Sequence, residues 1–127
     1  MADDLAKKGM EVRTQLFGEK AAKAGHAYLS EFDPGFADFL NDQVFGAVWG
    51  RPGLPIKTRS FITMAALTAL GRGPELKIHM RGALNLGITK EEIKELIIHL
   101  SQYSGVPTAV EAIRAFTEVT APPKPGQ

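Results

Sequence analysis

The 127-residue sequence contains no cysteine. This absence excludes disulfides, thiolate metal sites, cysteine nucleophiles and thiol peroxidase chemistry. No stretch approaches the roughly eighteen uninterrupted apolar residues that a membrane span needs. The first residues also lack an apolar core of signal-peptide length. We therefore expect a cytoplasmic protein without a secretory address.

The chain also lacks an excess of charge of either sign. Its 15 Lys and Arg residues stand against 14 Asp and Glu residues, for a formal net charge of +1. A nucleic-acid-binding domain normally carries a strong basic footprint, so neither nucleic acid nor a membrane surface is an expected partner. The length suits one domain, which we expect over residues 1–120, followed by a flexible proline-rich tail over residues 121–127.

Every well-patterned segment predicts a helix, and no segment predicts a strand. Caps mark several boundaries: Gly18 ends the first helix, Asp33 and Pro34 open another, and Thr89 with Glu92 forms a capping box. The expected helices cover residues 5–17, 34–50, 58–70, 75–87, 89–104 and 107–119, and residues 19–29 should form a short helix or an irregular turn. Two prolines and two glycines predict an ordered loop over residues 49–55. The fold class is therefore all-α, with six or seven helices in one compact domain.

The apolar periodicity predicts which helix faces are buried. Residues 58–70 are apolar nearly all round and should form the central core helix, and Met64 and Met80 should fill the core. Three other helices should bury the faces formed by Phe36, Phe39, Leu40, Val44, Phe45 and Val48; by Ile93, Leu96, Ile97, Leu100 and Tyr103; and by Val110, Ile113, Phe116 and Val119. Ile98 lies outside these stripes, which suggests that another subunit covers some surface.

Glu75 and His79 are the first candidates for chemistry. Residues four apart lie on one face of a helix, so the carboxylate and the imidazole can touch. Such a pair can donate or accept a proton near neutral pH. The alternative is a structural imidazole satisfied by the carboxylate.

Several segments together resemble the carboxymuconolactone decarboxylases, a family within the larger group that includes the alkylhydroperoxidase D-type proteins. The resemblance runs from about Gly9 to Phe116. Its most telling segments are Trp-Gly-Arg-Pro-Gly-Leu at 49–54, Lys-Thr-Arg-Ser at 57–60, Glu-Leu-Lys-Ile-His at 75–79, Asn-Leu-Gly-Ile-Thr-Lys-Glu-Glu-Ile at 85–93 and Tyr-Ser-Gly-Val-Pro at 103–107.

The resemblance implies an all-α, alkylhydroperoxidase D-like fold, commonly a hexameric ring. In the peroxidase branch two cysteines and a histidine form a thiol relay. Aligning that histidine with His79 places Arg72 and Glu75 at the cysteine positions and Ser60 at the position of the relay glutamate. The implied reaction is cofactor-free and metal-free decarboxylation of 4-carboxymuconolactone to 3-oxoadipate enol-lactone, a step of protocatechuate degradation by the β-ketoadipate route. We therefore expect an anionic lactone as the partner, and a homo-oligomer, hexameric or trimeric.

That reaction assigns hypothetical roles to the candidate residues. His79 would protonate the dienolate, and Glu75 would orient the imidazole. The candidates for substrate binding are Trp49, Arg51, Arg59, Arg72 and His99. Four of these five have a structural alternative: loop packing for Trp49, tying of the loop for Arg51, an ion pair for Arg59, and a buried imidazole near Tyr103 for His99. His26 is expected to be a plain surface residue.

Two other functions stay open on the sequence alone. The chain could act by proton transfer on a different carbonyl or lactone substrate, because fold and site type do not fix a substrate. It could also be a non-catalytic oligomeric binding protein that keeps the fold.

Overall fold

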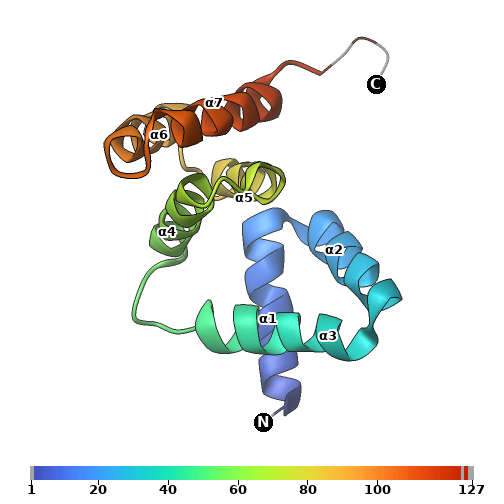
Figure 1. The fold of residues 1–127 in the computed structure, drawn as a ribbon. Coiled ribbons are helices and arrows are strands. Elements are labelled where there is room, and N and C mark those ends of the chain that lie inside the picture. The colour runs from blue at the N-terminus through green and yellow to red at the C-terminus, as the bar shows by residue number, and fades with distance from the viewer. Residues whose placement is uncertain (1, 124, 126–127) are drawn as a thin grey trace. The chain divides into compact units, whose positions relative to one another are not determined.

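The computed structural model describes residues 2–123 and 125, and the helices account for its regular structure (Figure 1). Over those residues the chain forms seven α-helices and one π-helical segment, in the order α1 (Ala2–Phe17), α2 (Glu19–Phe32), α3 (Pro34–Phe39), η1 (Leu40–Val48), α4 (Ile56–Ala69), α5 (Gly73–Asn85), α6 (Lys90–Ser104) and α7 (Val106–Thr120). The predicted all-α class is confirmed.

The chain divides into two compact units, which we call unit 1 (residues 1–59) and unit 2 (residues 60–127). Helix α4 begins in unit 1 and continues into unit 2. The expected proline-rich tail contains positions 124, 126 and 127, which lie outside the described residues. Before it, α7 ends at Thr120.

Two helix boundaries of unit 1 lie where the sequence predicts, at Gly18 and at Asp33. Gly18 follows α1 with a positive φ of 89°, a conformation that glycine adopts without strain. The side chain of Asp33 accepts a hydrogen bond from the backbone N–H of Phe36 at 2.8 Å, which caps α3. The segment 19–29, expected as a short helix or an irregular turn, is helical and extends to Phe32 in α2. The predicted loop at 49–55 is present.

The helix expected over residues 34–50 changes its winding at Leu40, where η1 begins. The backbone N–H of Trp49 donates to the carbonyl of Val44 at 2.9 Å, the five-residue spacing of a π-helix. The predicted buried face is wrong in part. Phe45 is buried, whereas Phe36, Phe39 and Val48 are about half exposed.

Helix α1 packs closely against η1 through glycines. A Cβ at Gly9 would overlap the carbonyl oxygen of Asn41, and one at Gly46 would lie 2.6 Å from the carbonyl oxygen of Leu5. The side-chain amide of Asn41 donates to the carbonyl of Ala6 at 2.9 Å. The two backbones therefore approach without a layer of side chains between them.

Unit 2 has its own core, to which α4, α5, α6 and α7 contribute. The buried members are Met64, Leu76, Met80, Ala83, Ile88, Ile93, Leu96, Ile97, Ala109, Ala112 and Ala115. Helix α7 packs against both α5 and α6, and Figure 1 shows α6 and α7 side by side. The predicted capping box at the start of α6 is present, with the Thr89 hydroxyl and the Glu92 carboxylate each accepting a backbone N–H. The prediction of Met64 and Met80 as core residues is confirmed.

Three predictions of buried faces in unit 2 are wrong in part. Helix α7 buries its alanines, while Val110 and Ile113 are exposed and Phe116 and Val119 pack only partly against the core. Small side chains let helices approach more closely, which explains why the alanine row faces inward. Tyr103 is 76% exposed on α6. Helix α4 is not packed on all sides, because Ile62 is exposed, and Leu70, which was expected in this helix, follows its last residue and is exposed too.

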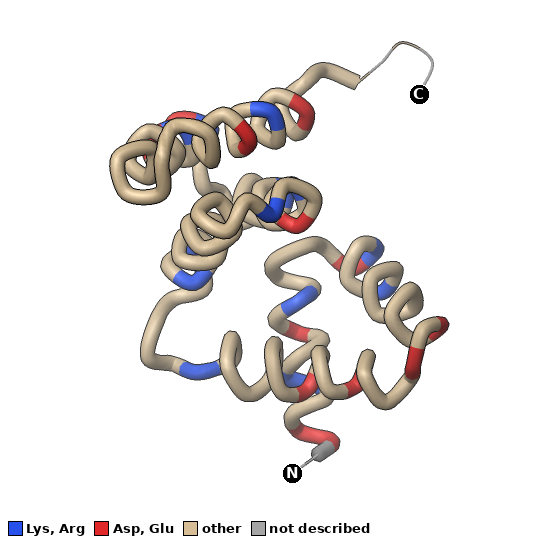
Figure 2. The backbone as a smooth tube through the Cα atoms, in the orientation of Figure 1, with Lys and Arg blue, Asp and Glu red and all other residues tan. Residues whose placement is uncertain are grey.

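The surface of each unit mixes both signs of charge along its helices (Figure 2). Ile98, expected outside the buried stripe, is 61% exposed. No helix within residues 2–123 is long and apolar enough to cross a membrane.

Candidate active site

The start of α5 carries the first part of the candidate site. Arg72 is the N-terminal cap residue of α5, held outside the helical conformation at φ −94° and ψ 69°. Its guanidinium Nη2 donates to Glu75 Oε1 at 2.7 Å. This hydrogen bond from Arg72 lowers the pKa of Glu75. The structure thus brings two predicted site residues together as an ion pair whose side chains are 61% and 43% exposed.

His79 lies one turn further along α5. It is intermediate in exposure, next to the buried residues Leu76 and Met80 of the same helix. Its side chain is half-buried, and this burial lowers the pKa of His79 from 6.5 to about 4. The imidazole is therefore neutral at physiological pH and can accept a proton or hold a hydrogen bond. The Glu75 carboxylate accepts its hydrogen bond from Arg72. The role of Glu75 in orienting His79 therefore stays a prediction.

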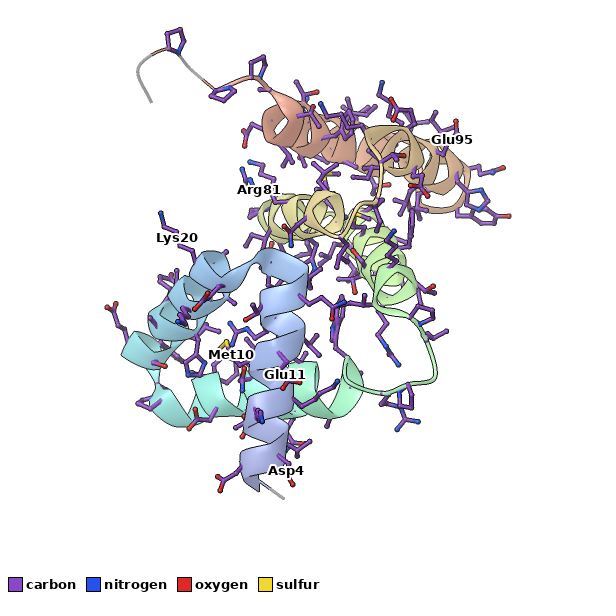
Figure 3. All side chains as sticks on the ribbon, turned by 180° about the vertical axis from the view of Figure 1, so that it is seen from behind. Asp4, Met10, Glu11, Lys20, Arg81 and Glu95 are labelled. Carbon is purple, nitrogen blue, oxygen red and sulfur yellow. The ribbon has the colours of Figure 1, made fainter. Side chains whose placement is uncertain are left out.

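The neighbouring cations of α5 are turned to another side of the helix. Lys77 donates to Glu118 Oε2 on α7 at 2.7 Å, and Arg81 also lowers the pKa of Glu118. Arg81 projects outward from α5 in Figure 3. Residues two apart on a helix do not face each other, so Lys77 and Arg81 do not share the face of His79. Their charges are balanced by Glu118.

His99 lies on a different surface of unit 2, in a groove of about 700 Å³ between α4 and α6. The lining residues are Phe61, Ile62, Ala65, Glu91, Glu92, Glu95, Leu96, His99 and Leu100. The prediction that His99 is buried is wrong: it is exposed, with its ring 5.2 Å from that of Tyr103. Three glutamates on this groove disfavour an anionic ligand there. Binding of substrate by His99 stays a prediction.

The other three predicted site residues belong to unit 1. Arg59 Nη2 donates to the carbonyl of Arg51 at 3.1 Å, so Arg59 holds the 49–55 loop against the start of α4. The side chain of Arg51 is exposed on that loop. Trp49 is half-buried, and its ring lies 5.8 Å from that of Phe45. The tie between loop and helix was expected of Arg51, but the guanidinium that makes it is that of Arg59.

Sequence reasoning missed a polar cluster around the buried Arg13 in unit 1. Arg13 on α1 is only 4% exposed, and its guanidinium lies over the Phe45 ring at 5.2 Å. Arg13 Nη1 lies 3.4 Å from His26 Nδ1, and His26 Nε2 lies 3.8 Å from Asp38 Oδ1. His26 is thus a half-buried partner of Arg13, which corrects its assignment to the plain surface. Burial lowers the pKa of Arg13. The available signal was the position of Arg13 beside Val12 and one turn before Leu16, on an otherwise apolar face.

The described residues contain no group of three or more His, Asp or Glu side chains placed to hold a metal ion. The start of α5 combines an imidazole kept neutral by burial with a carboxylate and a guanidinium that pair one turn before it. Such a set suits proton transfer next to a bound anion.

Comparison with known proteins identifies the family of the chain. The profile of the carboxymuconolactone decarboxylase family matches residues 34–118. The chain is 46% identical over 113 residues to the 4-carboxymuconolactone decarboxylase of Acinetobacter baylyi, covering 89% of this chain and 84% of that protein. It is 32% identical over 106 residues to the nitrosuccinic acid decarboxylase of Metarhizium robertsii, covering 84% and 74%. An uncharacterised 15.0 kDa protein of Paracoccus denitrificans is 32% identical over 114 residues, covering 82% and 85%.

By class, therefore, the protein is a carboxy-lyase, in keeping with both relatives that carry the name of an activity. The chain belongs to the carboxymuconolactone decarboxylase family. The resemblance drawn from the sequence segments is confirmed.

Proposed function

We propose that the protein decarboxylates 4-carboxymuconolactone to 3-oxoadipate enol-lactone without a cofactor, in the protocatechuate route of aromatic degradation. The observation that carries this proposal is the 46% identity, over most of both chains, to a protein of that name. The residues at the start of α5 support it, because they supply a cation for a carboxylate and an imidazole for a proton.

The reaction requires little of the protein. The carboxylate that leaves is vinylogous to the lactone carbonyl, so the C–C bond breaks with its electron pair delocalised into the ring and onto the lactone oxygen. Carbon dioxide departs, and the dienolate then takes one proton at a ring carbon. The protein must hold two carboxylates, stabilise the developing negative charge and deliver that proton.

In this proposal Arg72 binds one substrate carboxylate, since a planar guanidinium can hold two carboxylate oxygens together. Arg51 and Arg59 are further proposed carboxylate-binding residues, although the bond from Arg59 to the loop carbonyl favours a positioning role for Arg59. Trp49 is proposed to form an apolar wall and His99 to contact the substrate.

His79 is the proposed acid. In the free protein burial keeps it neutral, so it must gain a proton when the substrate binds. Nearby carboxylates favour the imidazolium and raise the pKa of a histidine, so an anionic substrate promotes this uptake. The imidazolium then protonates the dienolate and returns to its neutral state.

The test is an assay of the purified protein with 4-carboxymuconolactone, following both loss of substrate and release of carbon dioxide. His79→Gln should lower kcat by about two to four orders of magnitude, the usual contribution of general acid catalysis. Circular dichroism should show that the variant remains helical. Wild-type turnover by His79→Gln would contradict the role of His79, and absence of turnover by the wild-type protein would contradict the substrate.

A second substrate class has an observation in its favour. A family relative is named for decarboxylation of nitrosuccinic acid, an open-chain acid rather than a lactone. If the assay with 4-carboxymuconolactone fails, release of carbon dioxide from nitrosuccinate would favour a decarboxylase of small open-chain dianions. Turnover of neither compound would favour a binding protein.

We also propose that the protein is a homo-oligomer, hexameric or trimeric, with further copies covering exposed apolar side chains such as Ile98 and Val106. The cytoplasm is its proposed location.

A further inference from the structure

The Glu75 carboxylate has two neighbours along α5. It pairs with Arg72 three residues earlier, at 2.7 Å, and His79 follows it four residues later. Both spacings place side chains on the same face of a helix. One carboxylate is therefore within reach of both a guanidinium and an imidazole.

The pair with Arg72 is weak enough to be exchanged. Both side chains are well exposed, at 61% and 43% of their surface, and water screens ion pairs of this kind. Arg72 is also the cap residue rather than part of the helix, so its guanidinium can turn toward an incoming anion without disturbing α5. Replacement of one carboxylate by another on Arg72 costs little.

We propose that Glu75 exchanges partners: it pairs with Arg72 in the free protein and with the His79 imidazole when an anionic group of a ligand occupies Arg72. The proposal rests on the proposed function for the nature of the ligand, a small carboxylate-bearing molecule. Binding of the anion then places the proton on His79 only when there is a substrate to receive it.

This exchange resolves a difficulty of the free structure. His79 is neutral there, and an acid must carry a proton. A carboxylate released onto the imidazole stabilises the imidazolium, and the proton comes from solvent. No new group is needed, because the ligand's carboxylate replaces Glu75 on Arg72 and Glu75 then faces His79.

Other charges near His79 do not account for the same effect. Lys77 and Arg81 lie on a different side of α5. There Lys77 pairs with Glu118 of α7, and Arg81 lowers the pKa of the same carboxyl. The part of α4 that belongs to unit 2 carries no charged residue between Ser60 and Ala69. Within unit 2, Glu75 is thus the carboxylate placed to respond to occupation of Arg72.

The experiment is a double-mutant cycle on the pKa of His79, measured by NMR titration of the imidazole nitrogens. It uses the full-length wild-type protein, Glu75→Gln, Arg72→Met and the double variant. In the wild-type background Glu75 is held by Arg72, so Glu75→Gln should change the pKa of His79 little. In the Arg72→Met background Glu75 is free, so removing it should lower the pKa of His79 by about one unit.

Arg114 and Glu111 on α7 provide a matched control, because they form the same kind of exposed pair at 2.6 Å. Arg114→Met and Glu111→Gln should leave the pKa of His79 unchanged. An effect of Glu75→Gln that is equal in the two Arg72 backgrounds would overturn the proposal, because Arg72 would then not control the carboxylate.

Succinate serves as the anion probe, with the Arg72 Nε resonance reporting its binding. In the wild-type protein succinate should shift that resonance and raise the pKa of His79. In Glu75→Gln it should shift the resonance but raise the pKa of His79 less, because only the charge of succinate then acts on the imidazole. A shift at Arg72 without a response of His79 in the wild type, or no shift at Arg72, would overturn the exchange. An equal rise in the two proteins would also overturn the exchange. These readouts need no turnover, so a failed decarboxylation assay would refute the proposed substrate and leave the exchange standing.

Discussion

At the scale of single residues, His79 is defined by burial. A neutral imidazole at the edge of a core is cheap to keep at pH 7 and costly to protonate. Its pKa of about 4 in the folded chain lies below the 6.5 of an exposed histidine. Between these two values the unfolded chain binds a proton that the folded chain does not.

This difference predicts a specific pH dependence of stability. Because the unfolded state binds more protons in that window, the folded state loses stability as the pH falls from about 7 to about 4, by about 3 kcal/mol through His79. His79→Gln removes this term, so the free energy of unfolding should fall less steeply with acidification than in the wild-type protein. Urea unfolding at several pH values measures both slopes. Parallel slopes would show that His79 does not titrate as a buried group.

The sequence predicted the residue types of the candidate site better than their partners. Glu75 and His79 are four apart, and periodicity placed them on one helix correctly. Periodicity does not specify which neighbour a flexible carboxylate binds. In the structure the Glu75 carboxylate accepts a hydrogen bond from Arg72, which lies just outside the helix. Likewise Arg59, not Arg51, provides the guanidinium that ties the proline-rich loop.

At the scale of elements, local sequence signals determine where helices begin and end, whereas packing between helices determines which helix faces are buried. Asp33, Thr89 and the glycines after α1 and α6 act within a few residues, so their effects could be read from the sequence. The switch to π-helical winding at Leu40 could not, because it brings Phe45 and Gly46 against a helix distant in the sequence. The burial of the alanine row on α7 could not be predicted either, because it depends on packing against α5 and α6.

Because α1 and η1 approach closely, replacing Gly9 should cost more stability than replacing a glycine in open space. Gly9→Ala puts a Cβ where the Asn41 carbonyl oxygen lies, so the helices must separate, and the free energy of unfolding should fall by about 1–3 kcal/mol. Gly53→Ala is the matched control, since a Cβ there meets nothing within 4 Å. Chemical denaturation of both variants makes the comparison. Equal stability of the two would mean that the helices do not cross at Gly9.

At the scale of the whole molecule, the surplus of exposed apolar side chains is the dominant feature. Ile98, Tyr103 and Val106 are 61%, 76% and 65% exposed on α6 and α7. Such side chains on neighbouring positions mark a surface that another protein copy can cover. The composition alone gave no sign of this, because the apolar fraction of 44% is ordinary.

Self-association is therefore the expected behaviour in solution. Analytical ultracentrifugation should give a mass that is a multiple of the 13.7 kDa chain. Ile98→Glu should shift the distribution toward smaller species, because it places a charge in the apolar contact. Gln43→Glu adds the same charge at an exposed polar position of η1, outside this apolar surface of α6 and α7, and should not. A monomeric wild-type protein would contradict the oligomer.

The crossing of α1 and η1 also bears on how the chain becomes ordered. Asn41 and Ala6 are 35 residues apart, yet their hydrogen bond belongs to a contact in which backbone meets backbone. Neither helix can open without exposing the other, so their amide protons should exchange with solvent as one cooperative group. During synthesis α1 leaves the ribosome before η1 does. Until η1 follows, the apolar face of α1 is uncovered, and a chaperone that binds nascent chains can contact that face.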